Sequence, residues 1–181
     1  MFVLMRAQLV LAALLISTMS VTASSGGNVS SSKGDDASSL IGTWRLVLAD
    51  YLPDKHSRWE HAYGEHPKGY FVYDKTSHVS IQVSNDPPTP PFESGDDYKP
   101  TAREAETAFL NYVAYFGTYS VDPVRHVVTH HVEGSLLPSF TGTDQERPYR
   151  LHGDNLELSD WETWRAVLVR VPPPNNRSSG P

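Results

Sequence analysis

The feature that most constrains this chain is a series of short segments rich in Tyr, Val, Thr and Phe, separated by turn residues. Residues 69–73 and 78–83 flank an Asp-Lys-Thr-Ser turn, and residues 117–121 and 125–133 flank Asp-Pro. Aromatic and β-branched residues favour strands, whereas Asp, Ser, Gly and Pro favour the turns of hairpins. The pattern predicts an all-β fold. Further strands are expected at residues 44–48, 146–151, 156–158 and 164–171.

Strands joined by hairpins leave sheet edges that must be covered, and closing the sheet into a barrel removes those edges. About eight strands enclose a space just large enough for one small ligand. The chain has 181 residues, which suits one domain. We therefore expect a closed antiparallel β-barrel of about eight strands.

One helix is expected within this series of strands. Thr101 and Glu104 form a capping-box pattern that marks its start. Residues 86–100, just before it, contain five prolines and are expected to form a loop. We expect this loop and the helix to cover the mouth of the barrel; a plain surface loop is the alternative. The residues at helical spacing, expected to face inward, are Ala102, Ala105, Phe109 and Tyr112.

The two ends of the chain differ in composition from its middle. Arg6, an apolar run over residues 7–16 and a Val-Thr-Ala cleavage pattern indicate a secretory signal peptide. The protein is therefore expected to be secreted, or periplasmic if its source is bacterial. An uncleaved membrane anchor is the alternative, although the apolar run is short for a bilayer. The expected organisation is a signal peptide (1–23), a disordered leader (24–39), a barrel domain (40–171) and a disordered tail (172–181).

Charge and cysteine content exclude several classes of partner. The formal net charge is -6 and no cluster of Lys or Arg is present, so nucleic acid is not an expected partner. The chain has no cysteine, which excludes disulfides and Cys-ligated zinc. No later segment is apolar over a bilayer's length, so no stable membrane insertion is expected once the signal is removed.

Several sequence blocks together resemble a known family. Residues 42–44 are Gly-Thr-Trp, the G-x-W motif at the start of the first lipocalin strand. The other matching blocks are residues 69–74, 112–119, 128–135 and 147–151. In this order they resemble the bacterial and fungal lipocalin-like domain family, a calycin-type barrel, over essentially the whole folded region. The resemblance implies a ligand-holding barrel, and some members of the family occur among natural-product biosynthetic proteins.

The resemblance also implies a structural role for Trp44. In lipocalins the Trp of G-x-W closes one end of the barrel beneath a basic residue of the last strand. Here Arg165 or Arg170 is expected to lie over the Trp44 ring.

A candidate catalytic pair lies in the segment 125–133. Alternation along a strand places Thr129, His131 and Glu133 on one face and His130 on the other. If His131 and Glu133 face the lumen, they are candidates for a general base and its orienting carboxylate, or for metal ligands. Alternatively, they bond each other and Arg147 or Arg150 and brace the barrel. His130 is then expected on the outer surface.

Other candidate groups carry weaker signals. His56, His61 and His66 recur every five residues, but their polar segment favours a solvated loop over a metal site. Ser135 and Ser139 lie outside any G-x-S-x-G elbow, so serine-hydrolase chemistry is not expected. No metal and no cofactor are expected.

The tyrosines suggest a ligand-binding surface. An aromatic body with a hydroxyl tip suits a pocket for a partly oxygenated apolar ligand, although such residues also form ordinary cores. The candidate ligand-binding residues are Tyr70, Tyr73, Tyr115, Tyr119, Thr129 and Arg147.

Three functions follow from these observations. The first is a secreted binding protein for a small, largely apolar molecule such as a lipid, polyketide or terpenoid. The second is a cofactor-free isomerase, cyclase or dehydratase acting on a natural-product intermediate, with His131 and Glu133 moving a proton. The third is an exported structural or interaction barrel whose lumen is filled by side chains.

Overall fold

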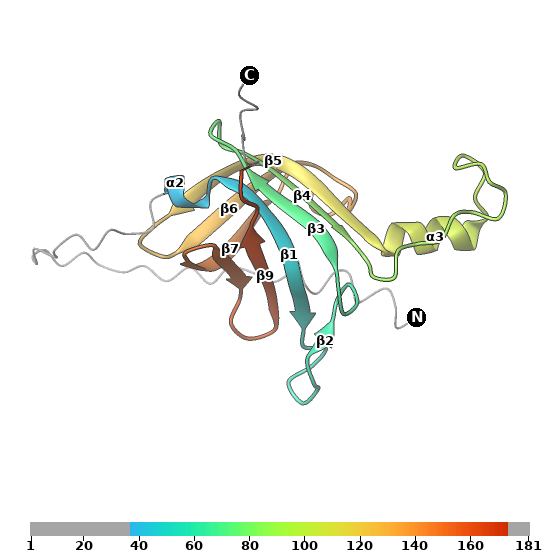
Figure 1. The fold of residues 1–181 in the computed structure, drawn as a ribbon, viewed down its shortest axis with the longest axis horizontal. Helices are drawn as coiled ribbons and strands as arrows, with labels where there is room; N and C mark the ends of the chain where they lie inside the picture. Colours follow the sequence, from blue (N-terminus) through green and yellow to red (C-terminus); the bar gives the residue numbers. More distant parts are fainter. Residues whose placement is uncertain (1–36, 174–181) are drawn as a thin grey trace, which may run out of the picture.

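The computed structural model describes residues 37–173 as one antiparallel sheet closed into a barrel (Figure 1). The sheet order is β2-β1-β3-β4-β5-β6-β7-β8-β9, and β1 also pairs with β9. The expected signal peptide, most of the expected leader and most of the expected tail lie outside the described residues. The strands are β1 (Gly42–Tyr51), β2 (Glu60–His61), β3 (Lys68–Tyr73), β4 (His78–Ser84), β5 (Tyr112–Asp122), β6 (Val127–Ser135), β7 (Asp144–His152), β8 (Asn155–Ser159) and β9 (Trp164–Arg170).

Closure of the barrel confirms the expected fold class. The first and last barrel strands pair from Trp44↔Arg170 to Tyr51↔Trp164, with an irregularity between Leu46 and Leu48. Strand β2 is the additional strand, and it pairs only with the end of β1 through Asp50↔His61 and Tyr51↔Glu60. The sequence pattern did not predict β2, and it placed the start of β5 at residue 117 instead of Tyr112.

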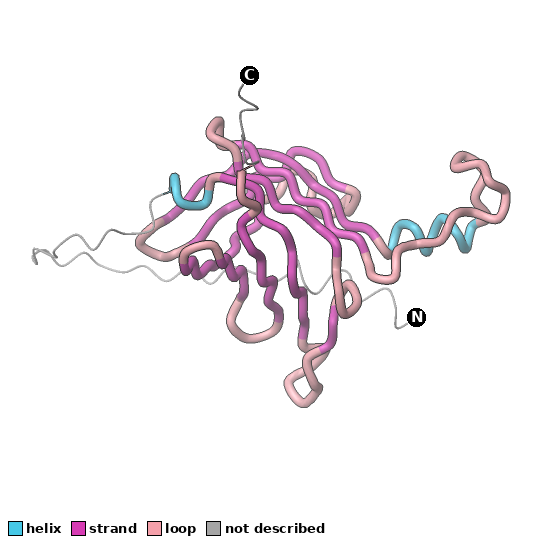
Figure 2. Tube along the Cα trace, in the orientation of Figure 1, coloured by secondary structure: helices cyan, strands magenta, loops and turns pink. Residues whose placement is uncertain are grey.

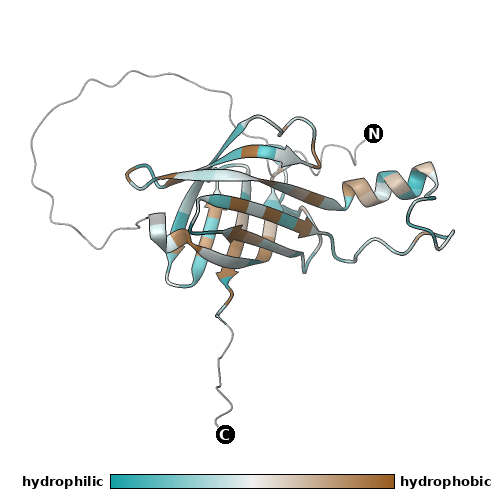
Figure 3. Cartoon of the chain, turned by 90° about the horizontal axis from the view of Figure 1, so that it is seen from above, coloured by the Kyte–Doolittle hydropathy of each residue, from teal (hydrophilic) through white to brown (hydrophobic). Residues whose placement is uncertain are grey.

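The core fills the inside of the barrel because the strands alternate between apolar and polar side chains. On β4, Val79, Ile81 and Val83 are buried, whereas the residues between them are half-buried or exposed. Figure 3 shows hydrophobic and hydrophilic residues interspersed along the barrel strands. Inward side chains of opposite walls therefore pack against each other across the barrel.

One end of the barrel is sealed by α2 (Ala37–Leu40). Leu40 is fully buried, and its carbonyl oxygen accepts a hydrogen bond of 2.8 Å from Nε1 of Trp44. Residues 37–39, which the sequence places in a disordered leader, thus belong to a helix at this end.

A bulge interrupts the pairing of β5 with β6. Phe116 pairs with Gly134 and Gly117 with Val132, so Glu133 has no partner in the ladder. At Gly117 a Cβ atom would lie 2.0 Å from the carbonyl oxygen of His131, so only glycine fits there. The bulge ends the regular alternation of β6 at Val132.

The helix α3 (Ala102–Leu110) starts at the predicted capping box but projects away from the barrel (Figure 1). None of its residues is buried, and Tyr112 lies exposed on β5. The expected inward face and the expected cover over the mouth were therefore wrong. The preceding loop runs beside the helix (Figure 2), where Glu104 accepts a 2.8 Å hydrogen bond from the backbone N–H of Glu93. No helix within residues 37–173 has the length and apolar character needed to cross a membrane.

Candidate functional site

A small cavity lies inside the barrel, between side chains of both walls. Its polar lining comes from Tyr63, Tyr115, Arg147 and Trp164. All of these except Tyr63 lie on barrel strands; Tyr63 lies on the segment between β2 and β3. The rest of the lining is apolar and consists of Leu46, Ala49, Phe71, Ile81, Val83, Leu158 and Ala166.

The cavity is smaller than the sequence led us to expect. Its volume is about 20 Å³, which is room for about one water molecule. An eight-stranded barrel was expected to enclose one small ligand. Large inward residues such as Tyr63, Phe71 and Trp164 occupy that space instead. A ligand of ordinary size therefore needs at least one of these side chains to move.

Two hydrogen-bond donors of the cavity lining have no partner. Among the described residues, neither Oη of Tyr63 nor Nε1 of Trp164 makes a hydrogen bond, and both atoms are buried. A buried donor left unsatisfied costs about 1–3 kcal/mol. Burial also raises the pKa of the Tyr63 hydroxyl, so it keeps its proton. Two residues that line this largely apolar cavity thus each have a buried donor without a partner.

Arg147 places a buried positive charge beside these donors. Its side chain is 2% exposed, and its guanidinium donates to the carbonyl oxygen of Glu146 and to Oε1 of Gln145, both at 3.0 Å. Its Cζ lies 5.4 Å from the centre of the Trp164 ring. Burial raises the pKa of Tyr115, and the charge of Arg147 opposes that rise. Arg147 therefore gives the cavity a positive potential that favours an electron-rich oxygen.

His130 fixes the tyrosine beside Arg147. Its Nδ1 lies 2.8 Å from Oη of Tyr115, and its Nε2 lies 2.9 Å from Oη of Tyr73. Complete burial, together with the charge of Arg147, holds the pKa of His130 well below its ordinary value of 6.5. A neutral imidazole donates through one ring nitrogen and accepts at the other, so both tyrosines can bond to it at once.

The structure separates the sequence-predicted ligand-binding residues into two groups. Tyr115 and Arg147 line the cavity, and Tyr73 and Tyr119 are buried beside it, with their ring centres 5.1 Å apart. Tyr70 is 49% exposed. Phe71 and Tyr73 are buried on the inner face of β3, and Tyr70 lies on the opposite face. The inner and outer positions on β3 alternate, so Tyr70 lies on the outer wall.

The predicted pair of His131 and Glu133 does not face the lumen. His131 lies on the outer face, where its Nε2 is 2.9 Å from Oγ of Ser120 and its Nδ1 is 2.7 Å from Oδ1 of Asp144. Glu133 is exposed at the bulge. Thr129 shares the outer face with His131, so these three residues do not reach the cavity.

His130, which was expected on the outer surface, is fully buried. This correction follows from the parity of β6, because Val128 and Val132 are buried on the same face as His130. The sequence carried this signal: Val128, His130 and Val132 share one face of the strand, and the polar residues Thr129 and His131 lie between them on the other face. Tyr63 and Trp164 were missed as well, and only the folded chain brings them together.

Trp44 is buried beneath Arg170, not beneath Arg165. Cζ of Arg170 lies 4.0 Å from the centre of the Trp44 ring. Arg165 instead bonds Oδ2 of Asp50 at 2.8 and 3.0 Å and lies over Trp59. The pairing register explains the choice, because Arg170 is opposite Trp44 and Arg165 is opposite Asp50.

The three histidines spaced by five residues are not gathered around a common point. Nδ1 of His61 lies 2.7 Å from Oδ1 of Asp50, at the end of β1. Within residues 37–173 no group of three or more His, Cys, Asp or Glu side chains is placed to hold a metal ion.

Comparison with known proteins agrees with this architecture. A family profile described as a lipocalin-like domain matches residues 41–168. The chain is also similar to the 4'-hydroxy-3'-methoxypropiophenone carrier protein ppsC of Aspergillus oryzae. The two are 37% identical over 87 residues, which cover 45% of this chain and 78% of that protein. With a closed barrel and a match over most of its length, this chain belongs to the lipocalin-like domain family.

Proposed function

We propose that the protein is a carrier that binds a small, largely apolar molecule inside its barrel through a hydrogen-bond-accepting oxygen. The observation that carries this proposal is the pair of unpartnered donors, Tyr63 Oη and Trp164 Nε1, in an apolar cavity beside Arg147. Binding an acceptor oxygen there removes the penalty of two unsatisfied buried groups. Family membership and the similarity to a carrier protein support small-molecule binding in the barrel.

The ligand class that fits best is an aromatic or otherwise apolar ketone. A ketone oxygen accepts two hydrogen bonds without bringing a full charge into the apolar cavity. The ligand in the name of the similar Aspergillus oryzae protein is itself an aromatic ketone. Polyketides and oxygenated terpenoids carry such groups, whereas a plain hydrocarbon would leave both donors unpaired.

Tyr63 is the side chain whose movement would admit the ligand. Of the residues that line the cavity, it alone lies outside the barrel strands. Its segment is held by two backbone hydrogen bonds, from Ala62 N–H to Ala49 at 2.8 Å and from Asp86 N–H to Tyr63 at 2.9 Å. A shift of this short segment would widen the cavity, keep the Tyr63 hydroxyl within reach of the bound oxygen and leave the barrel ladders intact.

The cavity suits binding better than proton transfer. Among the described residues, no Asp or Glu lines it. His130 bonds a tyrosine at each ring nitrogen, and burial disfavours its charged form. General base catalysis needs a group that can accept a proton from the bound molecule. The lining provides donors and a cation, which hold an oxygen in place.

The cluster on the outer face does not change this proposal. Ser120, His131 and Asp144 have the connectivity of an acyl-transfer triad. However, the His131 and Asp144 side chains are 40% and 67% exposed. Water competes for hydrogen bonds at such a site and weakens the coupling between the three groups.

We also propose that the carrier acts outside the cytoplasm. Support comes from the sequence alone, in the basic residue, apolar run and small-residue cleavage pattern of residues 1–23.

A matched pair of probes tests the ligand class. Propiophenone and propylbenzene have the same ring and a similar size, but only propiophenone has an acceptor oxygen. We expect propiophenone to bind roughly tenfold more tightly, which corresponds to about 1.4 kcal/mol. In Tyr63→Phe this preference should shrink, whereas Tyr70→Phe, on the outer wall, should keep it. Equal affinity of the wild-type protein for the two probes, or binding of neither, would overturn the proposal.

A further inference from the structure

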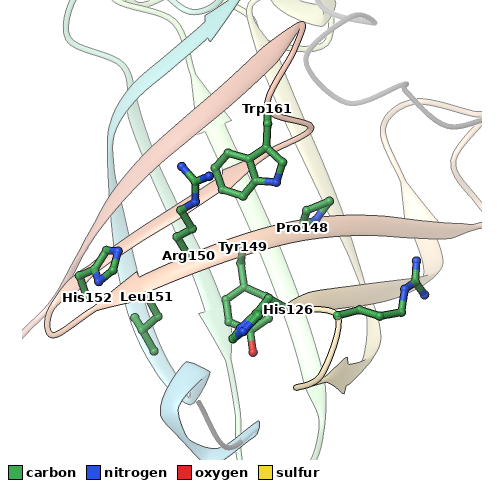
Figure 4. A pocket seen from close by; sticks show the side chains of 8 residues that line it. His126, Pro148, Tyr149, Arg150, Leu151, His152 and Trp161 are labelled. Atoms are coloured by element: carbon green, nitrogen blue, oxygen red, sulfur yellow. The ribbon is translucent and has the colours of Figure 1, made fainter. Parts of the chain in front are cut away.

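A second pocket lies on the outer wall of the barrel, around β7 (Figure 4). Its volume is about 440 Å³, and it shares no residue with the cavity inside the barrel. Its walls come from β7, the β5–β6 turn and the loop before β9. We call it the β7 pocket. It is lined by Arg125, His126, Pro148, Tyr149, Arg150, Leu151, His152 and Trp161.

The β7 pocket gathers basic side chains in an acidic protein. Two arginines, Arg125 and Arg150, and two histidines, His126 and His152, line it. None of the residues that line it is Asp or Glu. The chain as a whole has a formal net charge of -6. A concentration of one sign of charge in a hollow raises the local concentration of ions of opposite sign.

Arg150 has donors available for a ligand. Its Cζ lies 3.9 Å from the centre of the Trp161 ring (Figure 4). No hydrogen bond or ion pair within residues 37–173 involves its guanidinium. Stacking on an aromatic ring fixes the plane of a guanidinium and leaves its edge N–H groups free to bind a carboxylate or phosphate in bidentate fashion.

Trp161 is held in position by its own loop. Its backbone φ is 67°, in the left-handed region that a bulky residue rarely adopts. The N–H of Trp161 donates to Oγ of Ser159 at 2.8 Å. Oδ1 of Asp160 accepts from the backbone N–H groups of Glu162, Thr163 and Trp164 at 2.9, 2.7 and 3.0 Å. The loop therefore fixes the ring on which Arg150 stacks.

A second strained residue lines the same pocket. His126 has φ of 52°, and of the non-glycine residues with positive φ in the described chain, only Ser77 lies elsewhere. Residues held in sparsely populated backbone conformations gather at binding sites, where the surrounding structure fixes them. The pocket thus combines a preoriented cation, a fixed aromatic ring and backbone strain.

We propose that the β7 pocket binds a small organic anion. Its carboxylate or phosphate group would bond the guanidinium of Arg150. Arg125 also lines the pocket, but its guanidinium pairs with both carboxylate oxygens of Glu146 at 3.3 Å. The apolar part of the anion would lie against Pro148 and Trp161. This site is independent of the ligand proposed for the lumen.

Four probes test the site by titration monitored through amide chemical shifts. Benzoate and phenyl phosphate carry an anion and a ring, benzyl alcohol carries the ring alone, and inorganic phosphate carries the anion alone. We expect benzoate or phenyl phosphate to shift the amides of residues 148–152 and 161 and to bind at least tenfold more tightly than benzyl alcohol. Inorganic phosphate should bind more weakly than phenyl phosphate. Benzyl alcohol binding as tightly as benzoate, inorganic phosphate binding as tightly as phenyl phosphate, or no binding of any anion would overturn the proposal.

Matched variants separate a built site from general charge attraction. Arg150→Gln should weaken benzoate or phenyl phosphate binding at least tenfold. Arg45→Gln removes the same charge from an exposed position on β1 and should leave binding unchanged. Trp161→Ala should weaken phenyl phosphate more than inorganic phosphate. If Arg150→Gln and Arg45→Gln weaken binding equally, only the overall charge matters and the site does not exist.

Discussion

The guanidinium of Arg170 lies over the indole ring of Trp44, with its Cζ 4.0 Å from the ring centre. The same guanidinium donates to the carbonyl oxygens of Ile41 and Ser39 at 2.8 and 2.7 Å. These contacts join the last strand to the segment that seals one end of the barrel. Because several contacts depend on one side chain, the pair is a sensitive point for stability.

We expect Arg170→Gln to lower the free energy of unfolding by about 2 kcal/mol, since it removes a cation–π contact and two hydrogen bonds. Urea unfolding measures the change. Arg45→Gln, at an exposed position on β1, is the control and should change stability by less than about 0.5 kcal/mol. An equally small effect of Arg170→Gln would show that the stacked pair does not stabilise the barrel.

Tyr63→Phe should stabilise the ligand-free protein while it weakens ketone binding. The Tyr63 hydroxyl is buried without a partner, so its removal should raise the free energy of unfolding by about 1 kcal/mol. Tyr115→Phe should do the opposite, because it removes the 2.8 Å bond to His130. Urea unfolding compares the two variants. A Tyr63→Phe protein less stable than the wild type would indicate that the hydroxyl has a partner in solution.

His130 should make stability depend on pH below neutrality. Its pKa in the folded state is depressed by burial, so the unfolded chain binds a proton that the folded chain does not. The contribution of His130 to the free energy of unfolding is therefore fully present above the unfolded pKa of about 6.5. Below that pH it falls by up to about 1.4 kcal/mol per pH unit.

Unfolding in urea at pH 7.5 and pH 5.5 measures this contribution. The wild-type protein should lose about 1 kcal/mol more between these pH values than His130→Asn, which is less stable at the start. His126→Asn, at an exposed turn, should behave like the wild type. If the wild type and His130→Asn lose equal stability, His130 is not the group responsible.

His131→Ala should leave the affinity for propiophenone within a few-fold of the wild-type value. Its side chain lies on the outer face and bonds Ser120 and Asp144, away from the cavity. His130→Asn is the matched comparison, since it loosens Tyr115 beside the ligand. A large loss of affinity in His131→Ala would place the ligand outside the barrel.

Export can be checked by the mass of the mature protein. Cleavage after Ala23 predicts a secreted chain that begins at Ser24. Intact-mass measurement of protein from the culture medium tests this. A mass that includes residues 1–23, or protein found only in the cell, would contradict it.

Local patterns were sufficient to predict the eight barrel strands, except for the first part of β5, but they missed the short strand β2. Alternating apolar residues such as Val79, Ile81 and Val83 mark one buried face. This alternation can be recognised in the sequence of one strand alone, before its neighbouring strands are known. The choice between Arg165 and Arg170 over Trp44 was left open because it depends on the register between β1 and β9. A shift of one residue there would turn every side chain to the other face.

The cavity could not be predicted in the same way. Tyr63 and Trp164 are about one hundred residues apart in the sequence and meet only because a connecting segment enters the barrel. The prediction that one face of α3 points inward was wrong for a related reason. Helical spacing shows that an apolar stripe exists, but packing decides whether another element covers it. Among the helices and strands, α3 mainly contacts β5, and none of its residues is buried.

Because β1 pairs with β9, the barrel can close only after its last strand has been synthesised. Trp44 and Arg170 belong to one ladder, so nearly the whole domain must leave the ribosome or the export channel before that ladder can form. Until then β1 presents an unpaired edge on that side, which is a template for association with other chains. A chain truncated before Trp164 would keep this edge permanently and should aggregate, whereas loss of the residues after Arg170 would still allow the last ladder to close.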